Sequence, residues 1–246
     1  MDFIKLDENG NYVGLPAPII ASLVVCLIIA VISIIVCIQA KKQDPLKKSS
    51  GLLLLAEMAV EYCDNFVKEN MGQAFVSKLG PYAGFCFASV FLGFTIGLFG
   101  FATPMTYYIV PLGLAIGSFL LIHITAIRYQ KWGYFERFVS PFPVFLPINL
   151  ISMWAPLISL SFRMFGNACS GMVLMTLVYG VFQMLSEMIF GGLTLPIAAV
   201  VAPFLHAYFD LFSAFIQTAI FAILSMLFAA SEVPNKIDLN DFENEF

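Results

Sequence analysis

A single arginine lies in the middle of a long apolar stretch of the sequence. Arg163 sits within the segment 156–167 (PLISLSFRMFGN), far from the next charged residue on either side. In a membrane-embedded helix, a cation at that depth costs about 2.5–3.5 kcal/mol on translocon-insertion scales unless a partner or water compensates it. Such a residue either serves ion transport or is satisfied internally by helix carbonyls or a carboxylate, and the arginine alone leaves both interpretations open.

Polar and small residues accompany this arginine at helical spacing. They recur every three or four residues and therefore share one face of a helix. A polar face within an apolar segment lines water or a protein interface rather than lipid. Its members are Asn149, Ser152, Pro156, Ser159, Arg163 and Asn167, and it ends in the small residues Ser170 and Gly171.

A second polar face follows later, where His206, Asp210, Ser213 and Gln217 succeed one another at four, three and four residues. His206 and Asp210 are one turn apart, so they can share a proton or a water, as a proton relay inside a membrane requires. The alternative is that these side chains hold helices together, at about 1–2 kcal/mol per polar contact in model peptides. Glu187 is a further carboxylate in the apolar segment before them.

The composition indicates a membrane protein. Of 246 residues, 60% are hydrophobic and 11% are charged, and the mean hydropathy is +0.91. Soluble domains have about 45–50% apolar and about 25% charged residues. The net charge of -4 argues against nucleic-acid binding. The five cysteines show no C-x-x-C spacing and no histidine at ligand spacing, so we expect neither a disulfide framework, nor a metal site, nor a cofactor.

The first third of the chain sets the topology. Residues 1–16 form a polar tail, and the apolar run 17–40 is long enough to span a bilayer. The basic patch at 41–48 belongs in the cytoplasm by the positive-inside rule, which places the amino terminus outside. Residues 51–79 are predicted to form an amphipathic helix on the membrane surface, although a helix that packs against a partner has the same periodicity.

The rest of the chain returns to the membrane. Residues 81–127 are predicted to form a helix pair, followed by the cytoplasmic cations Arg128, Lys131 and Arg137. Residues 143–231 are almost continuously apolar, with a turn near Gly191-Gly192. Two helices of about 35–45 residues would measure about 50–65 Å, against about 30 Å of hydrocarbon. They must therefore tilt as a hairpin or break at their prolines, and we favour the hairpin. Residues 232–246 are then an acidic cytoplasmic tail.

The sequence therefore predicts an all-α membrane protein that forms a single domain. Its expected elements are about five membrane-embedded helices and one amphipathic surface helix. The last two helices are long and tilted as a hairpin.

Three segments together resemble the subunit a family of F-type ATP synthases. They are 147–150 (PINL), 159–167 (SLSFRMFGN) with Gly171 four residues on, and 215–221 (FIQTAIF), and the likeness extends over roughly 75–230. The resemblance implies a non-catalytic stator subunit that provides proton half-channels in a bacterial cell membrane. Its implied partners are the c-ring, the peripheral-stalk b subunits, the F1 sector through the assembled complex, and lipid. In that family the arginine, here Arg163, faces the carboxylate of each passing c subunit, deprotonates it and blocks leak. Asn167 would lie one turn further on, and Gln217 would face the arginine.

The chain departs from the family at two positions. Members often carry a carboxylate or histidine nine residues after the arginine, where this chain has Met172, and an aspartate where it has Tyr107. Members also often carry a histidine or carboxylate seven residues before the glutamine, and in this chain that residue is Asp210. The outer half-channel therefore has Glu187, His206 and Asp210 as its candidate groups.

Two other functions are compatible with parts of the sequence. An ion-coupled secondary transporter would also carry intramembrane ionisable residues, but neither an internal repeat nor paired broken helices are evident. The H-x-x-x-D spacing of His206 and Asp210 suits a membrane acyltransferase, but no second substrate-binding motif accompanies it.

Overall fold

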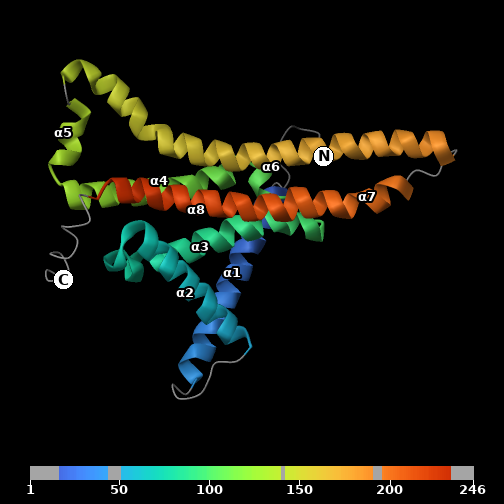
Figure 1. Cartoon of the computed structure of the whole chain (residues 1–246), viewed down its shortest axis with the longest axis horizontal. Helices are drawn as coiled ribbons and strands as arrows, with labels where there is room; N and C mark the ends of the chain where they lie inside the picture. Colours follow the sequence, from blue (N-terminus) through green and yellow to red (C-terminus); the bar gives the residue numbers. More distant parts are fainter. Residues whose placement is uncertain (1–16, 44–50, 140–141, 191–195, 234–246) are drawn as a thin grey trace, which may run out of the picture.

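The computed structural model describes residues 17–43, 51–139, 142–190 and 196–233. In these ranges every regular element is helical, which confirms the predicted all-α class (Figure 1). Short 3₁₀ turns join some of the helices. The α-helices are α1 (Ala17–Lys42), α2 (Leu52–Met71), α3 (Val76–Thr95), α4 (Ile109–Gln130), α5 (Gly133–Val139), α6 (Leu146–Phe190), α7 (Pro196–His206) and α8 (Ser213–Ser231).

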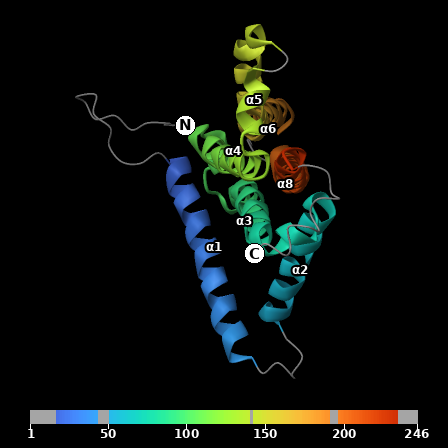
Figure 2. The ribbon, with the colours of Figure 1, turned by 90° about the vertical axis from the view of Figure 1, so that its left-hand side faces the viewer.

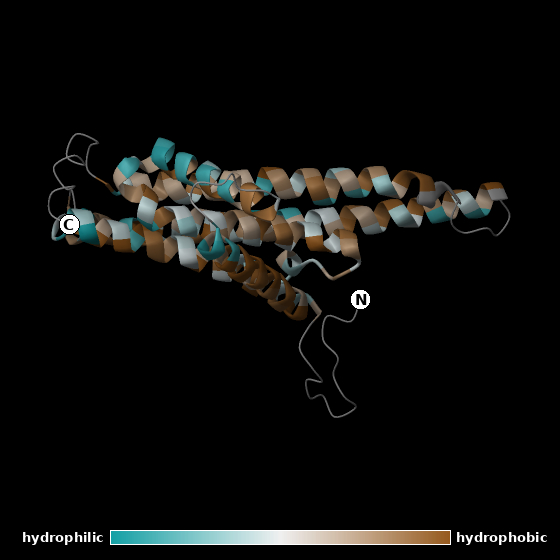
Figure 3. Cartoon of the chain, turned by 90° about the horizontal axis from the view of Figure 1, so that it is seen from below, coloured by the Kyte–Doolittle hydropathy of each residue, from teal (hydrophilic) through white to brown (hydrophobic). Residues whose placement is uncertain are grey.

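Five helical segments of the described chain are long and apolar enough to cross a membrane, as the sequence predicts. Hydrophobic residues cover most of the long helices, while hydrophilic residues gather toward the end of the molecule where the carboxyl terminus lies (Figure 3). The segments are Ala17–Lys42, Gln73–Phe99, Ile109–Gln130, Leu146–Ile189 and Val200–Ser231.

The last two spans form a hairpin. Helix α6 has 45 residues, or about 67 Å at 1.5 Å per residue, more than twice the roughly 30 Å hydrocarbon thickness. Helices α7 and α8 run back beside it, and α1 extends across the direction of this hairpin (Figures 1 and 2). Pro156 and Pro203 lie inside α6 and α7 without ending them. Breaks at these two prolines, the alternative to a continuous hairpin, do not occur.

A π-helical turn, Ala207–Phe212, joins α7 to α8. Hydrogen bonds from i to i+5 add a residue to the turn, so the residues after it are rotated about the helix axis relative to a regular α-helix. Such turns inside α-helices are frequent at functional sites. Asp210 lies within this turn, and His206 is the residue immediately before it.

The predicted amphipathic helix over 51–79 is shorter than expected. Helix α2 ends at Met71, and Gly72 has φ 102° and ψ 167° with its N–H bonded to the Lys68 carbonyl. Only glycine adopts this backbone conformation readily, so the residue ends the helix. The chain then restarts in α3 at Val76, and Pro81 is accommodated inside α3.

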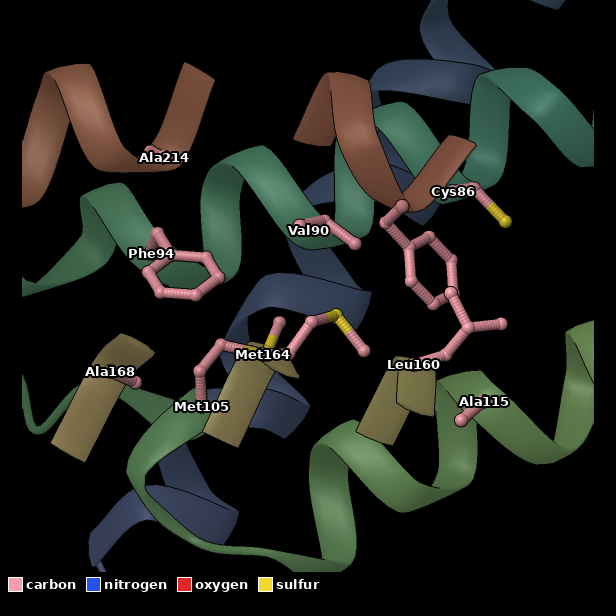
Figure 4. Packing of buried hydrophobic residues seen from close by; sticks show 10 residues of the cluster. Cys86, Val90, Phe94, Met105, Ala115, Leu160, Met164, Ala168 and Ala214 are labelled. Atoms are coloured by element: carbon pink, nitrogen blue, oxygen red, sulfur yellow. The ribbon is translucent and has the colours of Figure 1, made fainter. Parts of the chain in front are cut away.

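The main core joins the hairpin to α3 and α4. Leu160, Met164 and Ala168 of α6 point into it, on the side of Phe94 of α3 (Figure 4). Phe221 of α8 belongs to the same buried cluster. The three α6 residues are spaced by four, which places them on one side of that helix. This packing fixes the rotation of α6 and therefore the direction in which its polar residues point.

Candidate functional site

Arg163 lies on the outer surface of the hairpin. The core positions Leu160 and Met164 are 1% and 0% exposed, and a residue next to Met164 is turned by about 100° around the helix axis. Arg163 is consequently exposed, with its Nη2 3.4 Å from Ser159 Oγ. Within the described residues it forms no ion pair. Internal neutralisation by a carboxylate of the described chain, one of the two interpretations of this arginine, is therefore not what the structure shows.

A cavity of about 470 Å³ begins one turn after Arg163. Asn167 and Gly171 of the predicted polar face line it, and α7 and the π-helical turn contribute His206 and Asp210. The structure thus brings the ends of both predicted polar faces to one space. The amino-terminal end of α1 and the connection between α3 and α4 form the rest of the wall.

His206 is held between two partners in this cavity. Its Nδ1 lies 2.6 Å from Asp210 Oδ2, and its Nε2 lies 2.7 Å from the hydroxyl of Tyr179 on α6. The side chains of His206 and Asp210 are 37% and 24% exposed, so both remain accessible from the cavity. Three groups that can bind and release a proton therefore form one continuous chain across the hairpin.

Tyr179 is a residue of this cavity that the sequence analysis did not single out. It follows Asn167 and Gly171 at multiples of four residues, so the α6 polar face continues beyond the small residues where it was taken to end. That spacing was the available signal. A tyrosine in an apolar helix is commonly a packing residue, and only the position of His206 across the hairpin gives its hydroxyl a partner.

Met172 lines the same cavity as Asp210. The apolar side chain that replaces the family's more usual titratable group therefore still faces the polar groups of α7 and the π-helical turn. A carboxylate placed at Met172 would open into that cavity.

Two candidate residues lie elsewhere. Gln217 is 3% exposed, and its Nε2 has no hydrogen-bond partner in the described part of the chain. It is not among the residues that line the first cavity, and it is one of the buried residues of α8. The π-helical turn lies between His206 and Gln217 and changes the α-helical spacing from which a single polar face was predicted. Glu187 is exposed, accepts a hydrogen bond of 3.1 Å from Gln183 and does not line the cavity.

A second polar cavity, of about 270 Å³, lies toward the other end of α6. Asn149, Ser152 and Pro156 of the α6 polar face line it. His123 of α4 and Glu232, which follows α8, complete its polar wall together with Arg137 of α5. The α6 polar face therefore runs from one cavity to the other.

Hydrogen bonds organise the second cavity. Glu232 accepts from Arg137 Nη1 at 2.5 Å and from Gln130 Nε2 at 2.8 Å. Asn149 Nδ2 donates to the carbonyl oxygens of Arg137 and Phe138 at 3.2 and 3.1 Å. These contacts fasten the segment after α4 to the start of α6 and the end of α8.

Arg163 occupies the stretch of α6 between the cavities. The second cavity reaches Pro156 and the first begins at Asn167. At 1.5 Å per residue, these positions lie about 10 Å before and about 6 Å after the arginine along the helix axis. No cluster of the described residues has the three ligands that a metal site would need.

Comparison with known proteins agrees with the motifs. Residues 19–230 match the sequence profile of a family described as ATP synthase A chain. The chain is 27% identical over 203 residues to ATP synthase subunit a of Mycoplasma genitalium, covering 76% of this chain and 69% of that protein. It is 31% identical to ATP synthase subunit a of Rhodospirillum rubrum over 70% and 72% of the two chains. For ATP synthase subunit a of Helicobacter pylori the identity is 31%, over 74% and 76%.

Proposed function

Because the chain belongs to the ATP synthase A chain family, a family of non-catalytic, proton-translocating membrane subunits, we propose that Arg163 separates two half-channels to the c-ring. The first cavity, with Asn167, His206 and Asp210, is the outer half-channel. The second cavity is the inner half-channel. Because the chain belongs to this family, we no longer consider it a secondary transporter or a membrane acyltransferase.

The observation that supports this assignment is the placement of two separate polar cavities on either side of the arginine along α6. Water in each cavity can carry protons part of the way through the membrane. A guanidinium stays cationic at physiological pH, so it repels a proton that would pass directly from one cavity to the other. Coupled transport requires that protons reach the c-ring from each side of the membrane through a separate cavity, with a fixed cation between the two cavities.

The mechanism follows from the cost of charge in lipid. A proton delivered from the outer cavity neutralises the carboxylate of a c subunit, which then faces lipid without the penalty of a buried anion. Rotation brings another protonated carboxylate toward Arg163. The positive charge of Arg163 favours the ionised form of this carboxylate, so its proton is released and leaves through the inner cavity.

The outer surface of the hairpin suits a large apolar partner. Phe162 beside Arg163 is 55% exposed, and Leu177 and Val181 further along α6 are 65% and 54% exposed. Large exposed apolar surfaces mark membrane-facing or protein-facing regions. We assign this surface to the c-ring. The b subunits and the F1 sector are partners through the assembled complex, and the amino terminus lies outside the cell with the carboxyl terminus in the cytoplasm.

The test is coupled transport by the assembled complex. Arg163→Ala should co-purify with the c-ring and the soluble ATPase head, yet lose both ATP-driven proton pumping and proton-driven ATP synthesis. Lys42→Ala, which removes a cation at the end of α1, is the matched control and should retain both activities. Coupled pumping by an assembled Arg163→Ala complex would refute the role of the arginine. Failure of the wild-type chain to co-purify with a c-ring would refute the proposed assembly.

A further inference from the structure

The contacts of His206 define which of its nitrogens carries a proton. Asp210 Oδ2 at 2.6 Å from Nδ1 acts as an acceptor when the carboxylate is ionised, so Nδ1 holds hydrogen. In the neutral imidazole, Nε2 is then an acceptor. The hydroxyl of Tyr179, 2.7 Å away, is the donor to it.

We propose that Tyr179 is a positioning residue of the outer half-channel, which holds His206 as the Nδ1–H tautomer and links it to the water of the cavity. This inference rests on the proposed proton-translocating function and adds a residue to it. Met172, on the same helix and in the same cavity, offers no titratable group.

The hydroxyl can serve both charge states of the imidazole. In the neutral state it donates its hydrogen to Nε2. When a proton from cavity water binds Nε2, the imidazolium N–H donates to the tyrosine oxygen, and the hydroxyl hydrogen turns toward water. Loss of that proton reverses both steps, so the tyrosine neither gains nor loses a proton over the cycle.

Two structural features restrict His206 to this arrangement. Its ring centroid lies 6.1 Å from that of Tyr179 with the planes tilted by 43°, so the tyrosine approaches the nitrogen rather than stacking on the imidazole. On the other side of the imidazole, the π-helical turn carries Asp210, which contacts Nδ1. The imidazole is therefore bound at both nitrogens by groups from opposite arms of the hairpin.

The tautomer can be measured without changing the site. The chain has two histidines, so a His123→Gln variant carrying ¹⁵N-histidine in the assembled complex reports His206 alone by solid-state NMR. We expect a neutral imidazole with hydrogen on Nδ1 and a hydrogen-bonded Nε2. Hydrogen on Nε2 of the neutral ring would overturn the proposal, whatever the transport activity.

Removal of the hydroxyl provides the second test. Tyr179→Phe should shift the Nε2 resonance of His206 in the His123→Gln background, because that nitrogen loses its donor. In a chain that keeps His123, it should slow ATP-driven pumping by about fivefold, the factor that one net hydrogen bond represents. Tyr208→Phe makes the same chemical change at an exposed position of the π-helical turn and should alter neither signal. An unchanged His206 spectrum in Tyr179→Phe would overturn the proposal. That result would leave the role of Arg163 intact, because Arg163→Ala tests the proposed function separately.

Discussion

The guanidinium of Arg137 and the carboxylate of Glu232 lie 2.5 Å apart, joining α5 to the residue that follows α8. Their side chains are 33% and 15% exposed, so the pair is shielded from water more than a surface ion pair. Gln130 donates to the same carboxylate. Glu232 thus holds one end of the hairpin to the segment that connects α4 to α6, and it shapes the second cavity.

Replacement of this carboxylate should loosen that end of the hairpin. Glu232→Gln leaves Arg137 without its counterion, and we expect a loss of about 1–2 kcal/mol, toward the low end for charged hydrogen bonds because Arg137 remains partly solvated. The measurement is thermal dissociation of the subunit from the purified complex. Glu136→Gln, on the same short helix α5 but exposed, is the control. If Arg137→Gln combined with Glu232→Gln cost the full sum of the single changes, the two residues would not be coupled.

Arginine geometry should matter at position 163 as well as its charge. Arg163→Lys keeps a cation but replaces a planar guanidinium with a compact, strongly hydrated ammonium on a flexible stem. We expect the complex to assemble and ATP synthesis to fall to near the level of Arg163→Ala. Synthesis by inverted vesicles under an imposed proton gradient measures this. Normal synthesis in Arg163→Lys would mean that a cation alone suffices.

Much of the architecture could be predicted because it depends on local pattern. The spans follow from runs of apolar residues, and the hairpin follows from a continuous apolar segment too long to stand upright in a bilayer. The polar face that carries Arg163 follows from the three- and four-residue spacing of Ser159, Arg163 and Asn167. These features need no knowledge of distant contacts.

The details of the site depend on interactions that local pattern does not contain. The prediction that Gln217 shares a face with His206 assumed regular α-helical spacing, whereas a π-helical turn lies between them and Gln217 is buried. Tyr179 acquires a role only because α7 brings His206 to it. The end of α2 at Gly72 depends on a backbone conformation that amphipathic periodicity does not reveal.

The orientation in the membrane can be tested by labelling from outside intact cells, in a background without the native cysteines. Cysteines at Asn9 and Gly192 should react with a membrane-impermeant maleimide, because we place both on the outer side. Cysteines at Lys47, Lys131 and Asn240 should react only after the membrane is opened. Labelling of Lys47→Cys in sealed cells would reverse the assigned orientation.

The reactivity of Cys63 should report its surroundings on α2. Burial and then the neighbouring Asp64 carboxylate raise the pKa of the Cys63 thiol. Less thiolate is present at neutral pH than for an ordinary cysteine, so alkylation should be slow and should accelerate as the pH rises above 8. A cysteine at the exposed position Glu61, with Cys63 replaced by serine, is the control and should react faster. Asp64→Asn should speed the reaction of Cys63, since it removes the charge but keeps the burial. Equal rates with and without the Asp64 charge would contradict its influence.

Asp210 and His206, the proton-binding groups of the first cavity, line it together with Met172. Asp210→Asn keeps the shape of the side chain but removes its ability to bind a proton, and we expect ATP-driven acidification of inverted vesicles to slow by roughly 100-fold. His206→Ala should slow it less, by about tenfold, because Asp210 can still exchange protons with cavity water. Met172→Glu added to Asp210→Asn should restore part of the flux, since the new carboxylate would open into the same cavity. Met172→Gln in that background is the matched control, because it adds polarity without a proton-binding group and should restore nothing. Unchanged acidification in Asp210→Asn would remove Asp210 from the pathway and leave Glu187, which lies outside the cavity, as the next carboxylate to replace.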